Sequence, residues 1–282
     1  MGWTERQASM LQEMGLRVEV RREPAVESAV ESVAEPVVAS VSARPPRVQT
    51  ATGEAASPKR PAPSLPPSPS LSPSVPLPFA QPMDTGSIDS MDWPALRLAV
   101  AGCTACKLCQ GRTNTVFGTG HTAAHWMVVG EAPGEQEDAQ GEPFVGKSGQ
   151  LLDNMLRAIG LSRDASGTDP SKQVYIANSV KCRPPGNRNP APDELAQCEP
   201  FLIRQVALLR PKIILAMGRF AVQSLLRSAE PIGKLRGRVH RFQGVPLIVT
   251  YHPAYLLRNL EEKARSWDDL CLALETANAD PA

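Results

Sequence analysis

The chain has 282 residues, of which 42% are hydrophobic and 21% are charged, and its formal net charge is +1. These values are ordinary for a globular protein, and the length suffices for one large domain or two small ones. No apolar run is long enough to span a membrane, and the first residues lack the basic-then-apolar layout of a secretory signal. We therefore expect a cytoplasmic protein without a membrane segment, in which clustered cysteines are more often metal ligands or catalytic groups than disulfides.

Proline divides the chain into two unequal regions. Residues 1–19 place Met10, Leu11 and Met14 on one side of a helical pattern, which predicts a short helix. Residues 20–90 are rich in Pro, Ser and Ala and offer little apolar mass to bury, so we interpret them as a disordered tether. Residues 91–282 are expected to form the folded domain. An unknown partner that docks to the N-terminal segment stays open as an alternative.

From Asp92 onward, short apolar runs alternate with helical patterns. Asp92 is expected to cap a helix that has Pro94 in its first turn. The runs that predict strands are 126–130, 174–178, 212–217 and 246–250. The later helical patterns are 149–159, 193–209, 220–226 and 262–276, and Pro200 should kink or split the second of them. This alternation predicts an α/β fold, a three-layer α/β/α sandwich around a mostly parallel four-stranded sheet.

Three of the predicted strands run directly into polar or glycine-rich segments. The first ends at Gly130, followed by Glu131 and Ala132. The second ends at Asn178, and His252 follows the fourth. A strand-terminal asparagine is often only a turn residue, and a lone histidine is more often structural. In open α/β sheets, however, ligands bind at the carboxyl ends of strands, so we expect these residues to meet in one pocket.

Four of the six cysteines have a spacing typical of a metal site. They are Cys103, Cys106, Cys182 and Cys198. Four thiolates suit either a structural zinc ion or an iron–sulfur cluster, and the spacing leaves both open. Cys109 extends the first pair to C-x-x-C-x-x-C and is a competing ligand, whereas Cys271 lies between leucines of the last predicted helix and is interpreted as a core residue.

Residues 141–148 match the phosphate-loop pattern G-x-x-x-x-G-K-[ST] of nucleotide hydrolases. That pattern requires a strand directly before it, and the nearest predicted strand ends at Gly130. Pro143 and Phe144 also stand where backbone N–H groups should surround phosphates. Nucleotide hydrolysis is therefore a minor alternative, although a helix that begins near Lys147 would still suit a single phosphate of a DNA backbone.

Four segments carry a joint pattern. They are GEAPGEQED at 130–138, GEPFVGKSGQLL at 141–152, NSVKCRPP at 178–185 and YHPAYLLR at 251–258. Together they resemble the family 4 uracil-DNA glycosylases, over residues 99–274. Ser148 departs from the alanine of many members. The resemblance implies an intracellular, nucleoid-associated monomer that excises uracil from single- or double-stranded DNA in base excision repair and leaves an abasic site.

The resemblance also implies a cofactor and a base pocket. It implies a 4Fe-4S cluster on Cys103, Cys106, Cys182 and Cys198, with Cys109 outside the pattern. It implies a uracil pocket formed by Gly130, Glu131, Ala132, Phe144, Asn178 and His252. Uracil would stack on Phe144, Asn178 would pair with its O4 and N3–H, and His252 would donate to its O2. Glu131 is the candidate for activating water, and Glu137 is expected to exclude the methyl group of thymine.

Several basic and apolar residues are candidates for holding DNA. Lys147, Arg236, Arg238 and Arg258 are expected to contact phosphates, which position the strand without reading its sequence. Leu256 and Leu257 would wedge into the gap left by a flipped base, and ordinary helix packing is the alternative for this pair. A non-catalytic iron–sulfur module that binds damaged DNA without forming product is the alternative to an enzyme.

Overall fold

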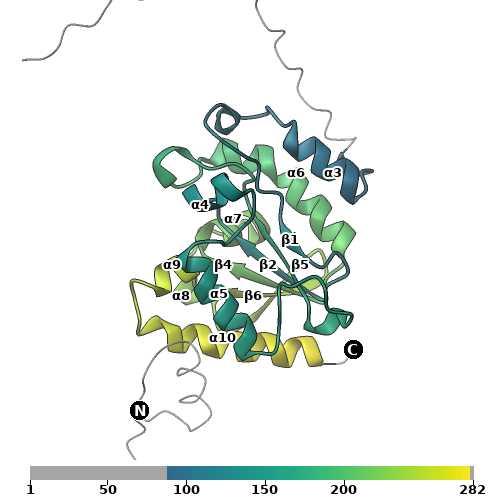
Figure 1. Cartoon of the computed structure of the whole chain (residues 1–282). Helices are drawn as coiled ribbons and strands as arrows, with labels where there is room; N and C mark the ends of the chain where they lie inside the picture. The colour runs from purple at the N-terminus through teal and green to yellow at the C-terminus, as the bar shows by residue number, and fades with distance from the viewer. Residues whose placement is uncertain (1–87, 280–282) are drawn as a thin grey trace, which may run out of the picture. The chain divides into compact units, whose positions relative to one another are not determined.

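The computed structural model describes residues 88–279. The short helix expected at residues 1–19 and nearly all of the tether expected at residues 20–90 lie outside the described residues. Residues 88–279 contain a six-stranded sheet in the order β1-β3-β2-β4-β6-β5, covered by helices (Figure 1). Within this part of the chain, no helix is long and apolar enough to cross a membrane.

The central strands of the sheet are parallel, as the sequence predicts. They are β2 (Trp126–Gly130), β3 (Val174–Asn178), β4 (Ile213–Met217) and β6 (Val245–Thr250). β3, β2, β4 and β6 lie side by side in that order. Every residue of β2, β3 and β4 is buried, which is typical of parallel strands covered on both faces. The carboxyl ends of the four strands therefore lie along one edge of the sheet.

The prediction of four strands was wrong, because an antiparallel strand closes each edge. β1 (Thr119–Gly120) pairs with β3, and β5 (Val239–Phe242) pairs with β6. β1 has only two residues, too few for a periodic pattern. β5 and β6 form a hairpin whose turn residues Gln243 and Gly244 both have positive φ, of 49° and 85°. The Gln-Gly pair between two apolar runs was a usable signal for this hairpin.

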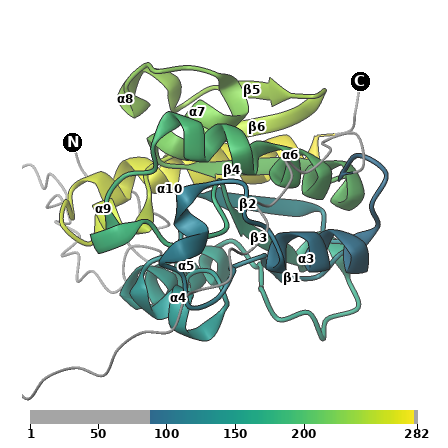
Figure 2. The ribbon, with the colours of Figure 1, turned by 90° about the horizontal axis from the view of Figure 1, so that it is seen from above.

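Helices cover both faces of the sheet. On β2, Trp126 and Val128 pack in one core cluster, whereas Met127 and Val129 pack in another. The first cluster is completed by α5 (Lys147–Ala158), α9 (Pro253–Leu256) and α10 (Glu262–Asn278), and the second by α6 (Pro192–Leu209) and α7 (Arg219–Leu226). Figure 1 shows α6 and α10 on opposite sides of the sheet, and Figure 2 gives the view from above.

The remaining elements are short except for the first helix. α3 (Trp93–Ala101) is capped by Asp92, whose Oδ1 accepts a hydrogen bond from the Ala95 N–H at 2.9 Å, as predicted. α6 continues through Pro200 without splitting. The other helices are η1 (Lys107–Gln110), α4 (Glu135–Gln140), η2 (Pro170–Lys172), η3 (Pro185–Asn187) and α8 (Ile232–Leu235).

A buried ion pair joins the segment before β5 to α10. Arg236 donates from Nε to Asp269 Oδ2 at 3.1 Å, and its Nη2 lies 3.0 Å from Oδ1. Gly237 N–H also donates to Asp269 Oδ1, at 3.2 Å. The Asp269 side chain is fully buried. Arg236, which the sequence analysis offered as a phosphate contact, therefore neutralises an interior carboxylate.

Replacing Arg236 with Met should destabilise the protein strongly, because it leaves the Asp269 carboxylate buried without its cation. Removing one partner of a buried pair typically costs about 3–5 kcal/mol of the free energy of unfolding. Urea unfolding of Arg236→Met measures this loss, with the exposed neighbour Arg238→Met as the matched control. An Arg236→Met variant as stable as Arg238→Met would show that the pair does not support the fold.

Candidate active site

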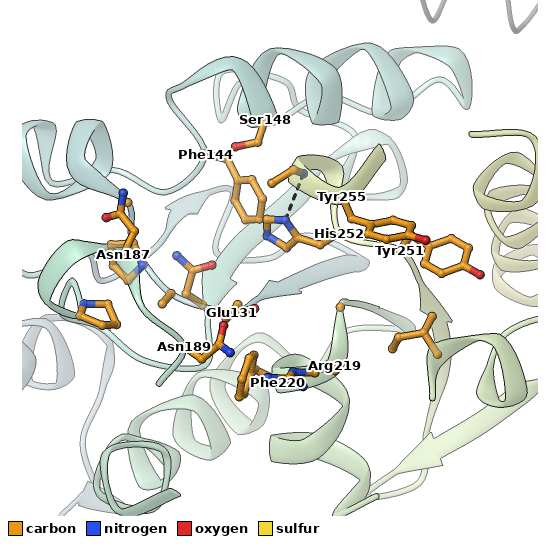
Figure 3. Close-up of a pocket in the computed structure, with 18 of the residues that line it drawn as sticks. Glu131, Phe144, Ser148, Asn187, Asn189, Arg219, Phe220, Tyr251, His252 and Tyr255 are labelled. Atoms are coloured by element: carbon orange, nitrogen blue, oxygen red, sulfur yellow. Dashed lines mark hydrogen bonds between the residues drawn. The ribbon is translucent and has the colours of Figure 1, made fainter. Parts of the chain in front are cut away.

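The loops at the carboxyl edge of the sheet enclose a cavity of about 850 Å³ (Figure 3). Segments that follow β2, β3, β4 and β6 all contribute to its walls. Among the predicted site residues, the lining includes Glu131, Ala132, Glu137, Phe144, Asn178, His252 and Arg258. Residues after the predicted strand ends therefore meet in one pocket, although Gly130, which was expected there, is not part of its lining.

Asn178 presents an unsatisfied amide in this cavity. Its side chain is buried, and within residues 88–279 its Oδ1 has no hydrogen-bond partner. Gly130 lies opposite Asn178 in the β2–β3 pairing. A Cβ on Gly130 would lie 2.5 Å from Asn178 Oδ1 and 2.6 Å from the Phe144 ring, so only glycine fits there. A buried acceptor without a partner costs free energy, which makes it a natural contact for a ligand N–H.

His252 stands at the end of β6 with a defined tautomer. Its Nδ1 accepts a hydrogen bond from the Ala254 N–H at 3.2 Å, drawn as a dashed line in Figure 3. The proton of the neutral ring is therefore on Nε2, which is available as a donor. The pKa of His252 is lowered to about 4, mainly by burial and to a smaller extent by the Arg258 cation, while Glu137 opposes the shift. The imidazole is consequently neutral at physiological pH.

Phe144 stacks on His252, with ring centroids 5.3 Å apart and planes inclined by 29° (Figure 3). Phe144 is 5% exposed and has a positive φ of 56°, a conformation that non-glycine residues rarely adopt. The strained backbone turns the ring toward the cavity instead of toward solvent. Local strain of this kind is concentrated at functional sites.

Two carboxylates line the cavity and differ in their environment. Glu137 accepts hydrogen bonds from the N–H groups of Gly134, Val145 and Gly146, at 3.0–3.1 Å. Glu131 directly follows β2, and burial raises the pKa of its carboxyl, which the Arg219 guanidinium partly offsets. Glu137 thus fixes the loops around it, whereas Glu131 faces the cavity with fewer constraints.

Sequence reasoning missed several residues of the pocket. Some lie in the loop after Cys182, which contributes Pro184, Asn187, Arg188 and Asn189. Others are Gly218, Arg219 and Phe220 at the end of β4, together with Tyr251 and Tyr255 beside His252. The segment after β4 follows the same strand-end rule as the predicted ones. Its Gly-Arg pair, directly after a buried strand, was a sufficient signal to include it.

Five of the six cysteines line a second, small cavity. They are Cys103, Cys106, Cys109, Cys182 and Cys198. Cys271 instead packs against the hydrophobic core, as predicted. Two cations stand beside the thiols. Arg112 Nη1 donates to Cys182 Sγ at 3.1 Å. Burial lowers the pKa of the Lys181 ammonium to about 8, and the nearby Cys198 and Cys182 oppose this shift.

The cysteine cavity lacks the geometry of a single-ion site. In the part of the chain that the structure describes, no group of three or more His, Cys, Asp or Glu side chains converges on a point where one metal ion could bind. Zinc requires its four ligand atoms about 2.0–2.3 Å from one centre. Within residues 88–279 the thiols are therefore not arranged as a preformed zinc site. Thiols distributed around a shared cavity beside two cations still suit a larger anionic group.

Comparison with known proteins places this arrangement in a family. The model of the uracil DNA glycosylase superfamily matches residues 117–271. The chain belongs to this superfamily. It is 44% identical over 181 residues to a type-4 uracil-DNA glycosylase of Sulfurisphaera tokodaii, which covers 61% of this chain and 78% of that protein. Type-4 enzymes of Thermotoga maritima and Saccharolobus solfataricus are 43% and 44% identical, covering 59% and 57% of this chain and 83% and 74% of theirs.

The structure of the glycosylase explains why its phosphate-loop pattern is misleading. Helix α4 ends at Gln140, directly before Gly141, so the pattern follows a helix and not a strand. Val145 and Gly146 direct their N–H groups to Glu137, which leaves neither free for a phosphate. The alternative of nucleotide hydrolysis is therefore disfavoured by the backbone of this loop.

The candidate DNA contacts of the glycosylase lie in different environments. Lys147, Arg238 and Arg258 are exposed, and only Arg258 of these lines the pocket. Leu256 is fully buried in the core, as the alternative of ordinary helix packing predicts. Leu257 is 42% exposed, so of the two leucines it is the one at the surface.

Acidification should destabilise the glycosylase through His252. An unfolded histidine titrates near pH 6.5, whereas the pKa of His252 in the folded protein is about 4. Below about pH 6.5 the unfolded state binds the additional proton first, so this part of the stability is lost as the pH falls toward 4. We expect His252→Gln to lose less stability than the parent between about pH 7 and pH 4.5.

Thermal unfolding at several pH values measures this difference, and His121→Gln, outside the pocket, serves as the control. Parallel pH profiles for the parent and His252→Gln would contradict a neutral buried imidazole.

Proposed function

We propose that this chain hydrolyses the N-glycosidic bond of deoxyuridine in DNA, releasing uracil and leaving an abasic site in base excision repair. The observation that carries the proposal is the buried Asn178 Oδ1, which has no hydrogen-bond partner among residues 88–279 and shares one cavity with a neutral histidine. Reaching such a cavity requires the target nucleotide to leave the stack, as enzymes that act on bases demand.

Base recognition follows from the amide of Asn178. Its Oδ1 accepts from uracil N3–H, and its Nδ2 donates to uracil O4. Cytosine presents an acceptor and a donor at the corresponding positions, so the same amide orientation rejects it. The ring of Phe144 supplies an apolar surface on which the flipped base stacks.

His252 is suited to stabilise the leaving group. Cleavage leaves negative charge on uracil, and the Nε2–H of a neutral imidazole donates to O2 where that charge develops. Protonation of Nδ1 would require losing its hydrogen bond to Ala254 N–H. The lowered pKa and the hydrogen bond therefore favour a neutral electrophile over a general acid. Backbone N–H groups of residues 130–132 add further dipoles toward the base.

Glu131 is the pocket carboxylate that remains for water. Glu137 already accepts three backbone N–H bonds, which leaves little capacity for another donor. Glu131 lines the same cavity without such bonds among the described residues. We propose that Glu131 orients the attacking water. Glu137 would lie near uracil C5 in a fixed position and exclude the methyl group of thymine.

The cysteine cavity supports a 4Fe-4S cluster on Cys103, Cys106, Cys182 and Cys198. The donor set is chemically suitable, and Arg112 and Lys181 compensate negative charge there. When bound, the cluster supplies a covalent tie between the segment before β1 and the loop after β3. Lys181 connects this cavity to the pocket, because its Nζ donates to the Asn178 carbonyl oxygen at 2.8 Å and so helps to fix the end of β3.

The exposed residues at and near the pocket suit DNA as the partner. Arg258 borders the pocket, and Arg238 and Lys147 are exposed cations that suit phosphates. Leu257 is the exposed apolar side chain available to fill the gap left by a flipped base. We propose that the chain acts as a monomer on uracil-containing DNA, single- or double-stranded, because one chain supplies all residues that line the pocket.

Purified, cluster-loaded protein should convert a uracil-containing oligonucleotide to an alkali-labile abasic strand. His252→Ala should lower the rate about 100- to 1000-fold, because it removes a donor to the developing charge. Single-turnover excision kinetics measure the rate, and a thymine-containing strand is the substrate control. Binding of uracil-DNA without any product would instead identify a non-catalytic damage-binding module.

Activity and folding have to be separated in this test. The melting temperature of His252→Ala should change far less than its rate, and His240→Ala on β5 is the matched histidine control. An equal loss of stability and rate would argue that His252 is structural.

Cluster binding should depend on four of the cysteines. Cys198→Ala should lose most of the bound iron and sulfide and the absorbance near 400 nm, because the remaining thiolates cannot complete the ligand set. Cys271→Ala should retain all three signals, since Cys271 packs in the core. Iron and sulfide determination makes the comparison, and Cys109→Ala should behave like Cys271→Ala. Stoichiometric zinc in a colourless protein would overturn the assignment.

A further inference from the structure

Phe144 occupies a backbone conformation that has to be enforced from outside. Its φ of 56° lies in the left-handed region, which is unfavourable for a bulky L-residue. The loop that carries it, residues 141–146, is neither helix nor strand. A short irregular loop does not hold such a residue unaided, so neighbouring groups must fix the conformation.

Arg163 contacts this loop at the strained position. Its Nη1 donates to the carbonyl oxygens of Pro143 at 3.0 Å and Phe144 at 3.1 Å. Its Nε donates to Asp153 Oδ1 on α5 at 2.6 Å, which orients the guanidinium. The Arg163 side chain is 20% exposed, so water competes little for these carbonyls. One cation therefore binds the peptide oxygens on both sides of the Phe144 Cα.

The N–H groups of the same loop are bound by a carboxylate. Glu137 accepts from the N–H groups of Val145 and Gly146, the two residues that follow Phe144. Gly149 closes the third side, because a Cβ there would lie 1.7 Å from the Phe144 carbonyl oxygen. The loop is thus clamped with its oxygens on Arg163, its N–H groups on Glu137 and its backbone against Gly149.

We infer that Arg163 is a positioning residue for base binding, which acts by holding the Phe144 ring in the pocket. Arg163 is not among the residues that line the cavity, so it would not touch a bound base. Its effect on the reaction would therefore be indirect, through the backbone of residues 143–144. This inference rests on the proposed function, because it assigns to Phe144 the stacking of a flipped uracil.

Arg163→Met keeps the apolar stem and removes the donors to both carbonyls. We expect it to weaken binding of free uracil, measured by calorimetry, and to raise the half-saturating enzyme concentration in single-turnover excision by roughly tenfold or more. The maximal single-turnover rate should fall less, because His252 and Asn178 remain in place. Arg163→Lys, which retains one cationic donor, should restore part of the loss.

Arg157→Gln is the matched control. Arg157 lies on the exposed side of α5 and donates to Asn154 at 2.8 Å, so its loss should change neither uracil binding nor excision. Wild-type protein without excision activity would refute the proposed function itself. Wild-type activity with an Arg163→Met variant indistinguishable from Arg157→Gln would refute only the role of Arg163.

A double-mutant cycle with Phe144→Leu separates positioning from general stability. If Arg163 acts through the ring, Arg163→Met should weaken uracil binding by less than about twofold once the ring is absent. Independent, multiplying losses in the two variants would overturn the inference. If Arg163→Met does not fold, the same cycle with Arg163→Lys decides, since the expected partial loss should also vanish in the Phe144→Leu background.

Discussion

The pairing of Gly130 with Asn178 is the constraint on which the site depends. The two residues end neighbouring parallel strands and lie opposite each other in the register. A Cβ on Gly130 would lie within 2.6 Å of both the Asn178 amide and the Phe144 ring, so the missing side chain is what admits both groups to one place. The polar and the aromatic faces of the pocket therefore arise from a single steric condition in the centre of the sheet. Any shift of register between β2 and β3 would separate them.

The cysteine cavity and the pocket are mechanically connected through one buried side chain. Lys181 is 1% exposed and donates to the Asn178 carbonyl at 2.8 Å and to Gln205 at 2.7 Å. The same ammonium lies beside Cys182 and Cys198. A buried cation is tolerated when hydrogen bonds and anions surround it, and thiolates that held a cluster would supply the anionic part. A cluster bound there would contribute position rather than reactivity, because Lys181, which would offset its negative charge, also fixes the strand end that carries Asn178.

The central fold could be predicted from the sequence because it depends on local patterns. Fully apolar runs identify parallel strands, and the rule that ligands bind at the carboxyl ends of such strands predicts that Glu131, Asn178 and His252 meet. The edge strands were missed because β1 is too short for a pattern and β5 is half exposed. The role of Arg236 was misjudged, since a basic residue near a glycine reads as a surface cation until its partner Asp269, far along the chain, is placed beside it. Long-range pairs of this kind leave no periodic signal in either segment.

A buried acceptor without a partner and a histidine held neutral by burial connect the stability of this fold to its function. Asn178 Oδ1 has no donor within the described residues, and His252 is held neutral by burial. Each lowers the stability of the folded protein, and each becomes favourable only when a base with a matching N–H and carbonyl enters. The strained Phe144 belongs to the same group, since the clamp of Arg163 and Glu137 stores its conformation before binding. The rest of the fold already offsets the free energy of burying Asn178 and His252 and of straining Phe144. The pocket therefore does not need to reorganise when a base binds, and this preorganisation favours selective binding.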